Sequence, residues 1–417
     1  MCKKSNLNLH QLYIEYIMRN TFILFCLIWL VGCTNQPKAP TDSALPVLDL
    51  TKDYPEMDID LQEIADVEYI PLETTEKSIA AYFLNPHISE KYIVTRDAHG
   101  PVQVYDRKGK FLHSVNKRGK GPHEYYTISS LAVDFEREEL YIWDSEKIQV
   151  YSLTGEWKRR LPTDENMFYK NFYSYDKKHL IFENTFNDGW NAQKLPADKT
   201  PYYLMNKETG ELTPLNLTIE NRISKTLERR VEDIDEHHAR PRILQIYNIF
   251  AVMANSNDFL IADFGLDTIY SYKDLKLTPL AIKYPPVHSR KPPIVLAPRV
   301  YSEQYLFFKP VKMTLNEDHP GEPYLIAPTL MWDRKDNKIY KVNIWDSEYT
   351  GKGFISHSMR DIRIEESNCF VMIHWASKLR EFYEAGKLKG KLKEVAAKLK
   401  EDDNDVIVIY KLKQKQL

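Results

Sequence analysis

Cysteine and long apolar runs are both scarce in this sequence. Its four cysteines, at positions 2, 26, 33 and 369, form no Cys-x-x-Cys pair, and the chain contains neither His-Glu-x-x-His nor Gly-x-Ser-x-Gly. The apolar run at 21–32 has about half of the roughly 20 residues that a membrane-spanning helix needs. These absences argue against a spanning helix and leave no local catalytic motif. We therefore expect no catalytic residues that a motif would reveal, no bound metal and no cofactor.

The N-terminal run has the features of an export signal. Arg19 precedes the apolar stretch 22–30, and Leu30-Val-Gly-Cys33 follows with a small residue before the cysteine. This end resembles a bacterial lipobox, which implies cleavage after residue 32 and acylation of Cys33. Met18 would give a more compact signal than Met1, because residues 1–17 fit the pattern badly.

Cleavage would leave a nearly neutral chain with two cysteines. The segment 1–32 carries three basic residues and one acidic residue, so its loss changes the net charge from −2 to −4. A chain so close to neutrality lacks the excess of basic residues that is typical of proteins that bind nucleic acid. Since Cys33 would be lipidated, no internal disulfide can form, and Cys369, in an apolar run, is expected to be buried.

The mature chain is expected to begin with a tether and continue as repeated β segments. Residues 33–62 are interpreted as the lipidated cysteine and a flexible linker, on the strength of the proline-rich, polar stretch 34–46. Further on, Gln103-Val-Tyr105 and Gln149-Val-Tyr151 recur at an offset of 46 residues, as do the turn glycines Gly109 and Gly155. Looser copies follow.

Repeats of 40–50 residues built from short strands predict a β-propeller. We expect an all-β, six-bladed propeller over residues 63–417. The last blade would combine 362–373 with 406–412, and the strand 67–72 from the other end would close the ring and remove an exposed sheet edge. Residues 376–400 interrupt the strand pattern with apolar residues at helical spacing. This spacing predicts a helical insertion packed on the propeller. The alternative is a helix that binds a membrane surface or a partner.

The chain resembles the six-bladed β-propeller lipoproteins of Gram-negative gut anaerobes, which are distantly related to NHL-repeat proteins. The resemblance is carried by the lipobox, the strand 67–72, Arg118-Gly-Lys-Gly-Pro-His-Glu-Tyr125, the segment 267–272 and the ending 405–412. His123 replaces the last glycine of the family's usual Gly-x-Gly-Pro-Gly-Glu loop. The resemblance implies a fold and an anchor but no activity, because fold does not decide function.

Candidate ligand-binding residues are aromatic or lie in loops. Trp190, Tyr301 and Tyr305 fall in segments that follow turns or join strands, where flat rings can stack on a sugar or a peptide. His123 and Glu124 stand in the loop after the first blade. The alternative for this loop is structural, with glycines at positive φ and Glu124 capping neighbouring amides, and it is favoured over a phosphate loop because no helix-opening Lys-Ser/Thr follows.

The acidic segment 232–238 contains four carboxylates and two histidines, but their spacing matches no metal loop. We interpret it as a solvated loop or helix.

We expect a non-enzymatic binding module for a glycan, a peptide or an envelope protein, anchored in the outer membrane through Cys33 and facing the periplasm or the exterior as a monomer. The alternative is an envelope glycan hydrolase or lyase with dispersed residues in the channel. Carboxylates grouped at one channel mouth would favour the enzyme, an aromatic or apolar face would favour binding, and a channel plugged by apolar side chains would indicate a structural spacer.

Overall fold

The computed structural model divides the chain into residues 1–42 and a compact unit of residues 43–417. The structure describes residues 44–79, 83–97, 100–165, 167–185, 200–231, 242–256, 258–316, 323–325, 328–351 and 363–413.

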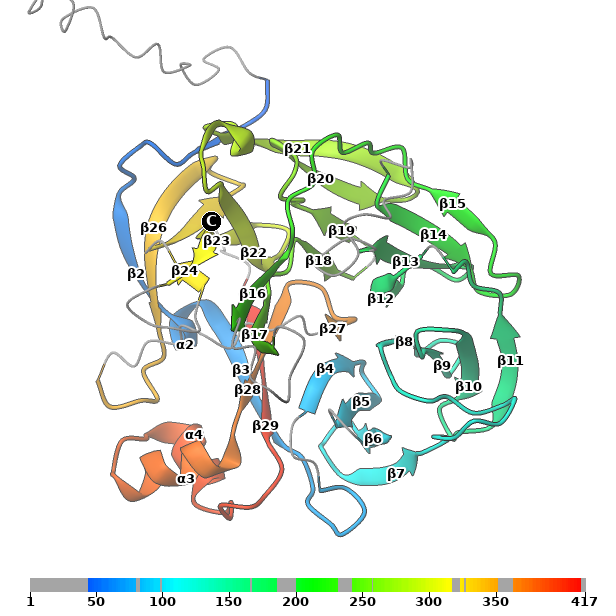
Figure 1. Cartoon of the computed structure of the whole chain (residues 1–417). Coiled ribbons are helices and arrows are strands. Elements are labelled where there is room, and N and C mark those ends of the chain that lie inside the picture. The colour runs from blue at the N-terminus through cyan, green and yellow to red at the C-terminus, as the bar shows by residue number, and fades with distance from the viewer. Residues whose placement is uncertain are drawn as a thin grey trace, which may run out of the picture. The chain divides into compact units, whose positions relative to one another are not determined.

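The unit is a six-bladed β-propeller, as expected (Figure 1). Its first three blades are antiparallel sheets whose strands follow one another in the sequence. The first comprises β4 (Phe83–Ile88), β5 (Tyr92–Asp97), β6 (Val102–Asp106) and β7 (Phe111–Val115). The second comprises β8 (Ser130–Asp134), β9 (Glu139–Trp143), β10 (Ile148–Ser152) and β11 (Trp157–Leu161). The third comprises β12 (Tyr169–Ser174), β13 (His179–Asn184), β14 (Tyr202–Asn206) and β15 (Leu212–Pro214).

Blades four and five each gain an outer strand from the N-terminal part of the unit. The fourth comprises β18 (Val252–Asn255), β19 (Asp258–Ile261), β20 (Thr268–Lys273), β21 (Lys276–Tyr284) and β1 (Val47–Asp49). The fifth comprises β22 (Ile294–Tyr301), β23 (Tyr305–Leu315), β25 (Thr329–Asp333), β26 (Lys338–Trp345) and β2 (Glu56–Asp60), and β24 (Pro323–Leu325) pairs with β23. A short 3-10 helix, η1 (Val287–Ser289), connects these two blades.

The tether is therefore shorter than the sequence suggested. β1 pairs in parallel with β21 and β2 with β26, so residues 47–60 belong to the propeller and the interpretation of 33–62 as a flexible linker is wrong for them. The physical reason is edge protection, since each added strand covers the outermost edge of a blade that would otherwise expose unpaired backbone groups.

The ring closes as predicted. The sixth blade contains β28 (Cys369–His374), β29 (Val406–Leu412) and β3 (Ala65–Pro71), with Val371 opposite Ile409 and Val67 opposite Tyr410. One detail differs from the expectation, because β27 (Arg363–Ile364) pairs in parallel with β4 of the first blade instead of joining the sixth. Cys369 is a buried free thiol, as expected, and burial raises its pKa to about 11.

Apolar clusters hold neighbouring blades together. Within the described part of the chain, each of the six interfaces between consecutive blades contains a buried cluster, including the one that joins blade six to blade one, and blades four and five share a second. The repeat's turn glycines, Gly109 and Gly155, have φ of 86° and 88°, values that favour glycine over any other residue. The sequence repeat thus marks both the turns between strands and the apolar residues that pack between blades.

Among the described residues, three α-helices lie outside the blades. The short α2 (Leu61–Ile64) leads from β2 into β3. The expected insertion at 376–400 is present as two helices, α3 (Ala376–Glu384) and α4 (Gly390–Ala396), because Gly386, with φ of 68°, ends the first. The predicted apolar stripe faces the protein, since Leu388 and Leu392 are buried with blades five and six. No helix among the described residues is long and apolar enough to cross a membrane.

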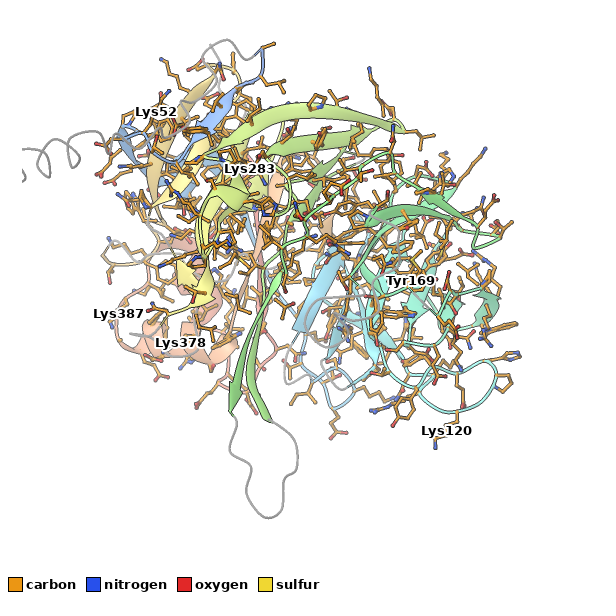
Figure 2. The ribbon with its side chains drawn as sticks, turned by 45° about the horizontal axis from the view of Figure 1, so that its top comes forward. Lys52, Lys120, Tyr169, Lys283, Lys378 and Lys387 are labelled. Carbon is orange, nitrogen blue, oxygen red and sulfur yellow. The ribbon has the colours of Figure 1, made fainter. Side chains whose placement is uncertain are left out.

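A two-stranded hairpin, β16 (Thr226–Val231) and β17 (Arg242–Asn248), follows blade three in the sequence, contacts β23 of blade five and extends away from the body of the unit (Figure 2). A buried ion network lies where this connection leaves the propeller. Lys225 pairs with Glu183 of blade three and with Asp263 of blade four, whose Oδ2 is 2.6 Å from its Nζ. Tyr202 donates a second hydrogen bond to Asp263 at 2.7 Å.

Candidate functional site

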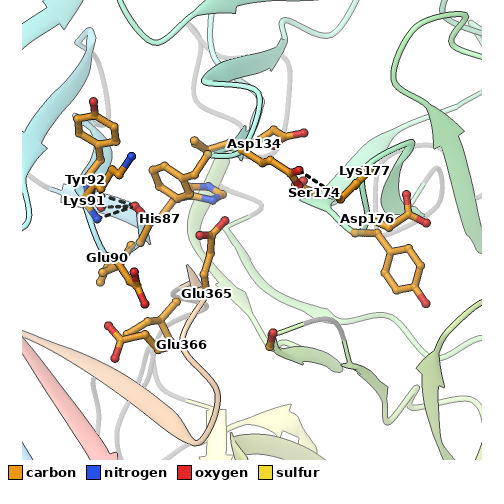
Figure 3. Close-up of a pocket in the computed structure, with 18 residues that line it drawn as sticks. His87, Glu90, Lys91, Tyr92, Asp134, Ser174, Asp176, Lys177, Glu365 and Glu366 are labelled. Atoms are coloured by element: carbon orange, nitrogen blue, oxygen red, sulfur yellow. Dashed lines mark hydrogen bonds and ion pairs between the residues drawn. The ribbon is translucent and has the colours of Figure 1, made fainter.

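A cavity of about 580 Å³ opens at one end of the propeller, where the first strand of each blade turns into the second (Figure 3). It is lined by turns of blades one to four and by the segment that follows β27. The lining residues are His87, Ile88, Ser89, Glu90, Lys91, Tyr92, Val133, Asp134, Phe135, Glu136, Ser174, Tyr175, Asp176, Lys177, Ser256, Ile364, Glu365 and Glu366. Because five parts of the chain meet here, the cavity exists only in the closed ring.

Local hydrogen bonds fix the turns around the cavity. In blade one the Ser89 hydroxyl accepts the backbone N–H of Tyr92 at 3.0 Å. In blade three Asp176 accepts the backbone N–H groups of Lys178 and His179, both at 2.7 Å. Small polar side chains that bond to the backbone two or three residues ahead favour such turns. The cavity rim is thus formed before any ligand arrives.

The lining carries more negative than positive charge, and most of the carboxylates already have partners. Buried Lys207 donates to Asp134 at 2.5 Å, Glu136 pairs with Lys177 at 2.8 Å, and Glu366 pairs with Arg107 at 3.2 Å. Asp176 is engaged by its own turn. Within the described residues, Glu90 and Glu365 form no ion pair, and neither does Lys91, the lysine next to Glu90 in the lining.

Glu365 has the most perturbed carboxyl group of the cavity. Although the Glu365 side chain is exposed to solvent, its partial desolvation, together with the negative charges of Asp134, Glu136 and Glu90, raises its pKa to about 7. Its side chain points into the cavity, as Figure 3 shows. A carboxyl group that titrates near neutrality can attract a cationic ligand or transfer a proton. No group of three or more His, Cys, Asp or Glu side chains suited to a metal ion occurs among the described residues.

His123 and Glu124 lie away from the cavity and have structural roles. The His123 ring stacks on Trp157 with centroids 3.9 Å apart, and Glu124 accepts the backbone N–H of Gly121 at 2.7 Å. The capping interpretation of this loop is therefore confirmed, but positive φ at its glycines is wrong. A Cβ on Gly119 would collide with the carboxylate of Glu124, so the glycine is there to make room for that side chain.

Tyr301 and Tyr305 are strand residues and not loop aromatics. Tyr301 ends β22 with 2% of its surface exposed, so the expectation that it presents a ring to a ligand is wrong. Tyr305 begins β23 and is half-buried, with its ring 6.4 Å from that of Phe307 in an edge-to-face arrangement. Blade packing explains both positions, because aromatic side chains suit the half-buried face of a strand.

Three further expectations lie outside the described residues: Trp190, the acidic segment 232–238 and the lipidation site Cys33. The cavity residues, in contrast, were missed. Their signal is weak, because Glu90-Lys91, Glu136-Arg137 and Asp176-Lys177 each look like an ordinary solvated turn. Only their common position within the repeat, directly after the first strand of a blade, could have brought them together.

Comparisons with known proteins add the following. The sequence model of a family described as a domain of unknown function (DUF4934) matches residues 45–283. The crystal structure of a Bacteroides fragilis NCTC 9343 protein classed as exported superposes with a TM-score of 0.56 at 14% identity, covering 87% of this chain and 100% of that chain. A member of the duf4221 family from Bacteroides vulgatus ATCC 8482 gives a TM-score of 0.45 at 10% identity, covering 84% and 97%. No curated protein matches the chain.

Proposed function

We propose a function for a chain that belongs to the DUF4934 family, whose description assigns no activity: it is a lipid-anchored binding module of the cell envelope. The observation that carries this proposal is the preformed cavity of about 580 Å³ at the end of the propeller, with a net negative lining. A pocket of this size suits a small ligand or the end of a chain. The similarity to a protein classed as exported supports an envelope or secreted location.

The anchor in this proposal is the acylated Cys33. The sequence before it supports an export signal, and the residues that follow lead within about 14 positions to β1. The short connection would hold the propeller close to a bilayer, for which we propose the outer membrane. The ligand would then be a molecule of the periplasm or of the cell exterior.

The carboxylates grouped at this mouth are the arrangement that was expected to favour an enzyme, but their partners favour binding over catalysis. A glycoside hydrolase needs two carboxyl groups in different protonation states on either side of the scissile bond. Asp134, Glu136 and Glu366 are engaged in ion pairs, so Glu90 would have to serve beside Glu365. A hydrolase or lyase is nevertheless the second candidate, because Glu365 has the pKa of about 7 that suits a general acid.

The experiment is a combined test of binding and turnover. The full-length chain, purified in detergent, is presented with arrays of glycans and short peptides, and the solutions are analysed for products by mass spectrometry. We expect retention without cleavage, and retention should weaken in Glu365→Gln but not in Glu384→Gln, a matched change at the exposed end of α3. Cleaved products would overturn the binding proposal in favour of the enzyme, and no retention on either array would overturn both.

A further inference from the structure

The helical insertion carries a concentration of positive charge. Residues 387–400 contain six lysines and one glutamate, although the net charge of the whole chain is −2. All six lysine side chains are exposed: Lys387, Lys389, Lys391, Lys393, Lys398 and Lys400. Because like charges repel one another at such spacing, an anion that approaches this part of the surface would be attracted.

The backbone of the insertion is fixed where this charge begins. Leu388 forms a bridge with Tyr349 and is buried, whereas Lys387 and Lys389 on either side of it are exposed. The backbone N–H of Thr350 donates to the carbonyl of Lys387 at 2.8 Å. Figure 2 shows Lys387 at the periphery of the unit. The positive charge is therefore part of the folded surface.

Local carboxylates do not neutralise these lysines. The two cations of α3 pair with Glu381 and Glu384, but none of the six lysines forms an ion pair within the part of the chain that the structure describes. The carboxylate of Glu348 lies close to α4, yet it accepts the backbone N–H of Lys391 and not its ammonium group. The charge of the insertion thus remains available to an outside partner.

The first four lysines are the part of this charge that is least compensated. An acidic turn at 401–403 follows Lys398 and Lys400, and Asp403 accepts the backbone N–H of Lys400 at 2.7 Å. The four that stand farther from this turn in the sequence are here named the lysine surface: Lys387, Lys389, Lys391 and Lys393.

The apolar side of the insertion is already covered. An amphipathic helix binds a bilayer by burying its apolar face among the lipids. Here Leu388 and Leu392 pack with blades five and six, so that face is not free. A contact made by the lysine surface must therefore be electrostatic, and added salt should weaken it.

The side chains of the insertion favour a membrane over a structured acidic partner. The lysine surface contains no arginine, whose planar guanidinium suits a fixed carboxylate, while lysine is a flexible point charge. Clustered lysines of this kind attract anionic lipid headgroups. Trp375, directly before α3, has 48% of its surface exposed, and indole rings are favoured at membrane–water interfaces.

The length of the proposed tether permits such a contact. Residues 34–46 separate Cys33 from β1, and even fully extended they would span at most about 45 Å. This length would keep the unit beside the bilayer without dictating which face meets it. A second contact is needed to set the orientation.

We propose that the lysine surface docks on anionic phospholipid headgroups and so orients the propeller on its membrane. The cavity is lined mainly by turns of blades one to four, whereas the insertion packs on blades five and six. The acidic cavity lining would be repelled by the same headgroups and would stay open to solvent. This inference adds an orientation to the proposed function and is independent of the ligand that the cavity binds.

The test is vesicle flotation with the chain from residue 33, which contains the whole compact unit, carrying Cys33→Ser so that no acyl chain contributes. We expect binding to phosphatidylcholine vesicles with about one-third phosphatidylglycerol to exceed binding to pure phosphatidylcholine by at least about tenfold. Sodium chloride at about 0.5 M should abolish the difference.

Matched variants locate the contact. Replacing the four residues of the lysine surface by glutamine should remove the preference for anionic vesicles, and replacing them by arginine should retain it. The control makes the same change at four exposed lysines scattered over other parts of the unit and should keep most of the preference: Lys52→Gln, Lys108→Gln, Lys276→Gln and Lys335→Gln.

Equal binding to neutral and anionic vesicles, binding that salt does not weaken, or equal losses in the two glutamine variants would overturn the inference. Absence of binding to either vesicle would overturn it as well. Because the protein in this experiment has no acyl chain, none of these outcomes decides whether Cys33 is lipidated or whether the cavity binds a ligand. Circular dichroism on each variant separates lost binding from lost folding, and the salt series on the unsubstituted surface needs no variant.

Discussion

Glu348, just beyond the last strand of blade five, accepts the backbone N–H of Leu392 at 2.8 Å and so caps α4 from a distant part of the chain. The same carboxylate accepts the N–H of Lys391 at 2.9 Å and the hydroxyl of Tyr69 at 2.6 Å. Gly390 is required beside it, because a Cβ there would collide with Glu348. One carboxylate thus connects blade five, blade six and the helical insertion.

Replacement of Glu348 should loosen that connection. Glu348→Ala leaves two helix N–H groups and a tyrosine hydroxyl without their partner, and we expect the free energy of unfolding to fall by about 1–2 kcal/mol. Urea denaturation measures the change. Glu384→Gln, which removes only an exposed pair with Arg380, should change stability by less than about 0.5 kcal/mol, and equal effects of the two variants would contradict the capping role.

Removal of Lys225 should be more costly. Lys225→Met would leave Asp263 buried without its cation and Glu183 with only the longer pair to Arg222 at 3.5 Å, and breaking a buried pair in this way costs about 3–5 kcal/mol. Lys378→Met, at an exposed pair with Glu381, is the matched control, with an expected cost of about 0–1 kcal/mol. Thermal unfolding followed by circular dichroism compares them, and similar midpoints for both variants would show that the network does not hold blades three and four together.

The loop at Gly119 offers a double-mutant cycle. Gly119→Ala should destabilise the protein, because the new methyl group takes the position of the Glu124 carboxylate. In a Glu124→Ala background the collision is absent, so the same change should cost less by at least about 0.5 kcal/mol. If the effects of the two substitutions on the free energy of unfolding are additive in denaturant titrations, the glycine is needed for its backbone conformation and not for the space beside it.

Stability should depend on pH through Glu365. The folded pKa of about 7 lies above the ordinary value of 4.5, so the folded state holds this proton over a window in which the unfolded chain has lost it. The contribution of Glu365 is therefore complete below about 4.5 and declines as pH rises toward 7. Glu365→Gln should reduce this slope in unfolding experiments between pH 4.5 and 7, relative to Glu384→Gln, and an unchanged slope would refute the assignment.

Membrane attachment should depend on Cys33. In a Gram-negative host, Cys33→Ser should move the protein out of the membrane fraction and abolish the mass increase of a lipid. Cys26→Ser, a change within the segment expected to be removed, should leave both unchanged. A Cys33→Ser protein that still fractionates with membranes would contradict the proposed anchor.

The sequence predicted the ring more fully than the site. Short segments rich in apolar residues at 67–72 and 406–412 allowed the closing strand to be identified, because a propeller with unpaired ends would expose a sheet edge. β1 and β2 escaped prediction because an outer parallel strand needs few apolar residues, and those segments lie beside a polar, proline-containing tether.

The cavity escaped prediction for a different reason. Glu90, Asp176 and Glu365 are far apart in the chain and each lies in a segment that is polar for local reasons. Only ring closure brings them together. The opposite error was made for Tyr301. An aromatic residue near a turn was expected to be exposed, but packing between neighbouring blades buries it.

The pairing of β1 with β21 and of β2 with β26 has a consequence for how the chain assembles. The first strands made are among the last that can pair, because their partners are separated from them by more than two hundred residues of sequence. During synthesis from the N-terminus, residues 47–60 must stay unpaired while four blades are built, and such distant contacts slow folding. Once paired, they form the outermost strands of blades four and five. The N-terminal segment therefore completes the fold only after most of the propeller has formed.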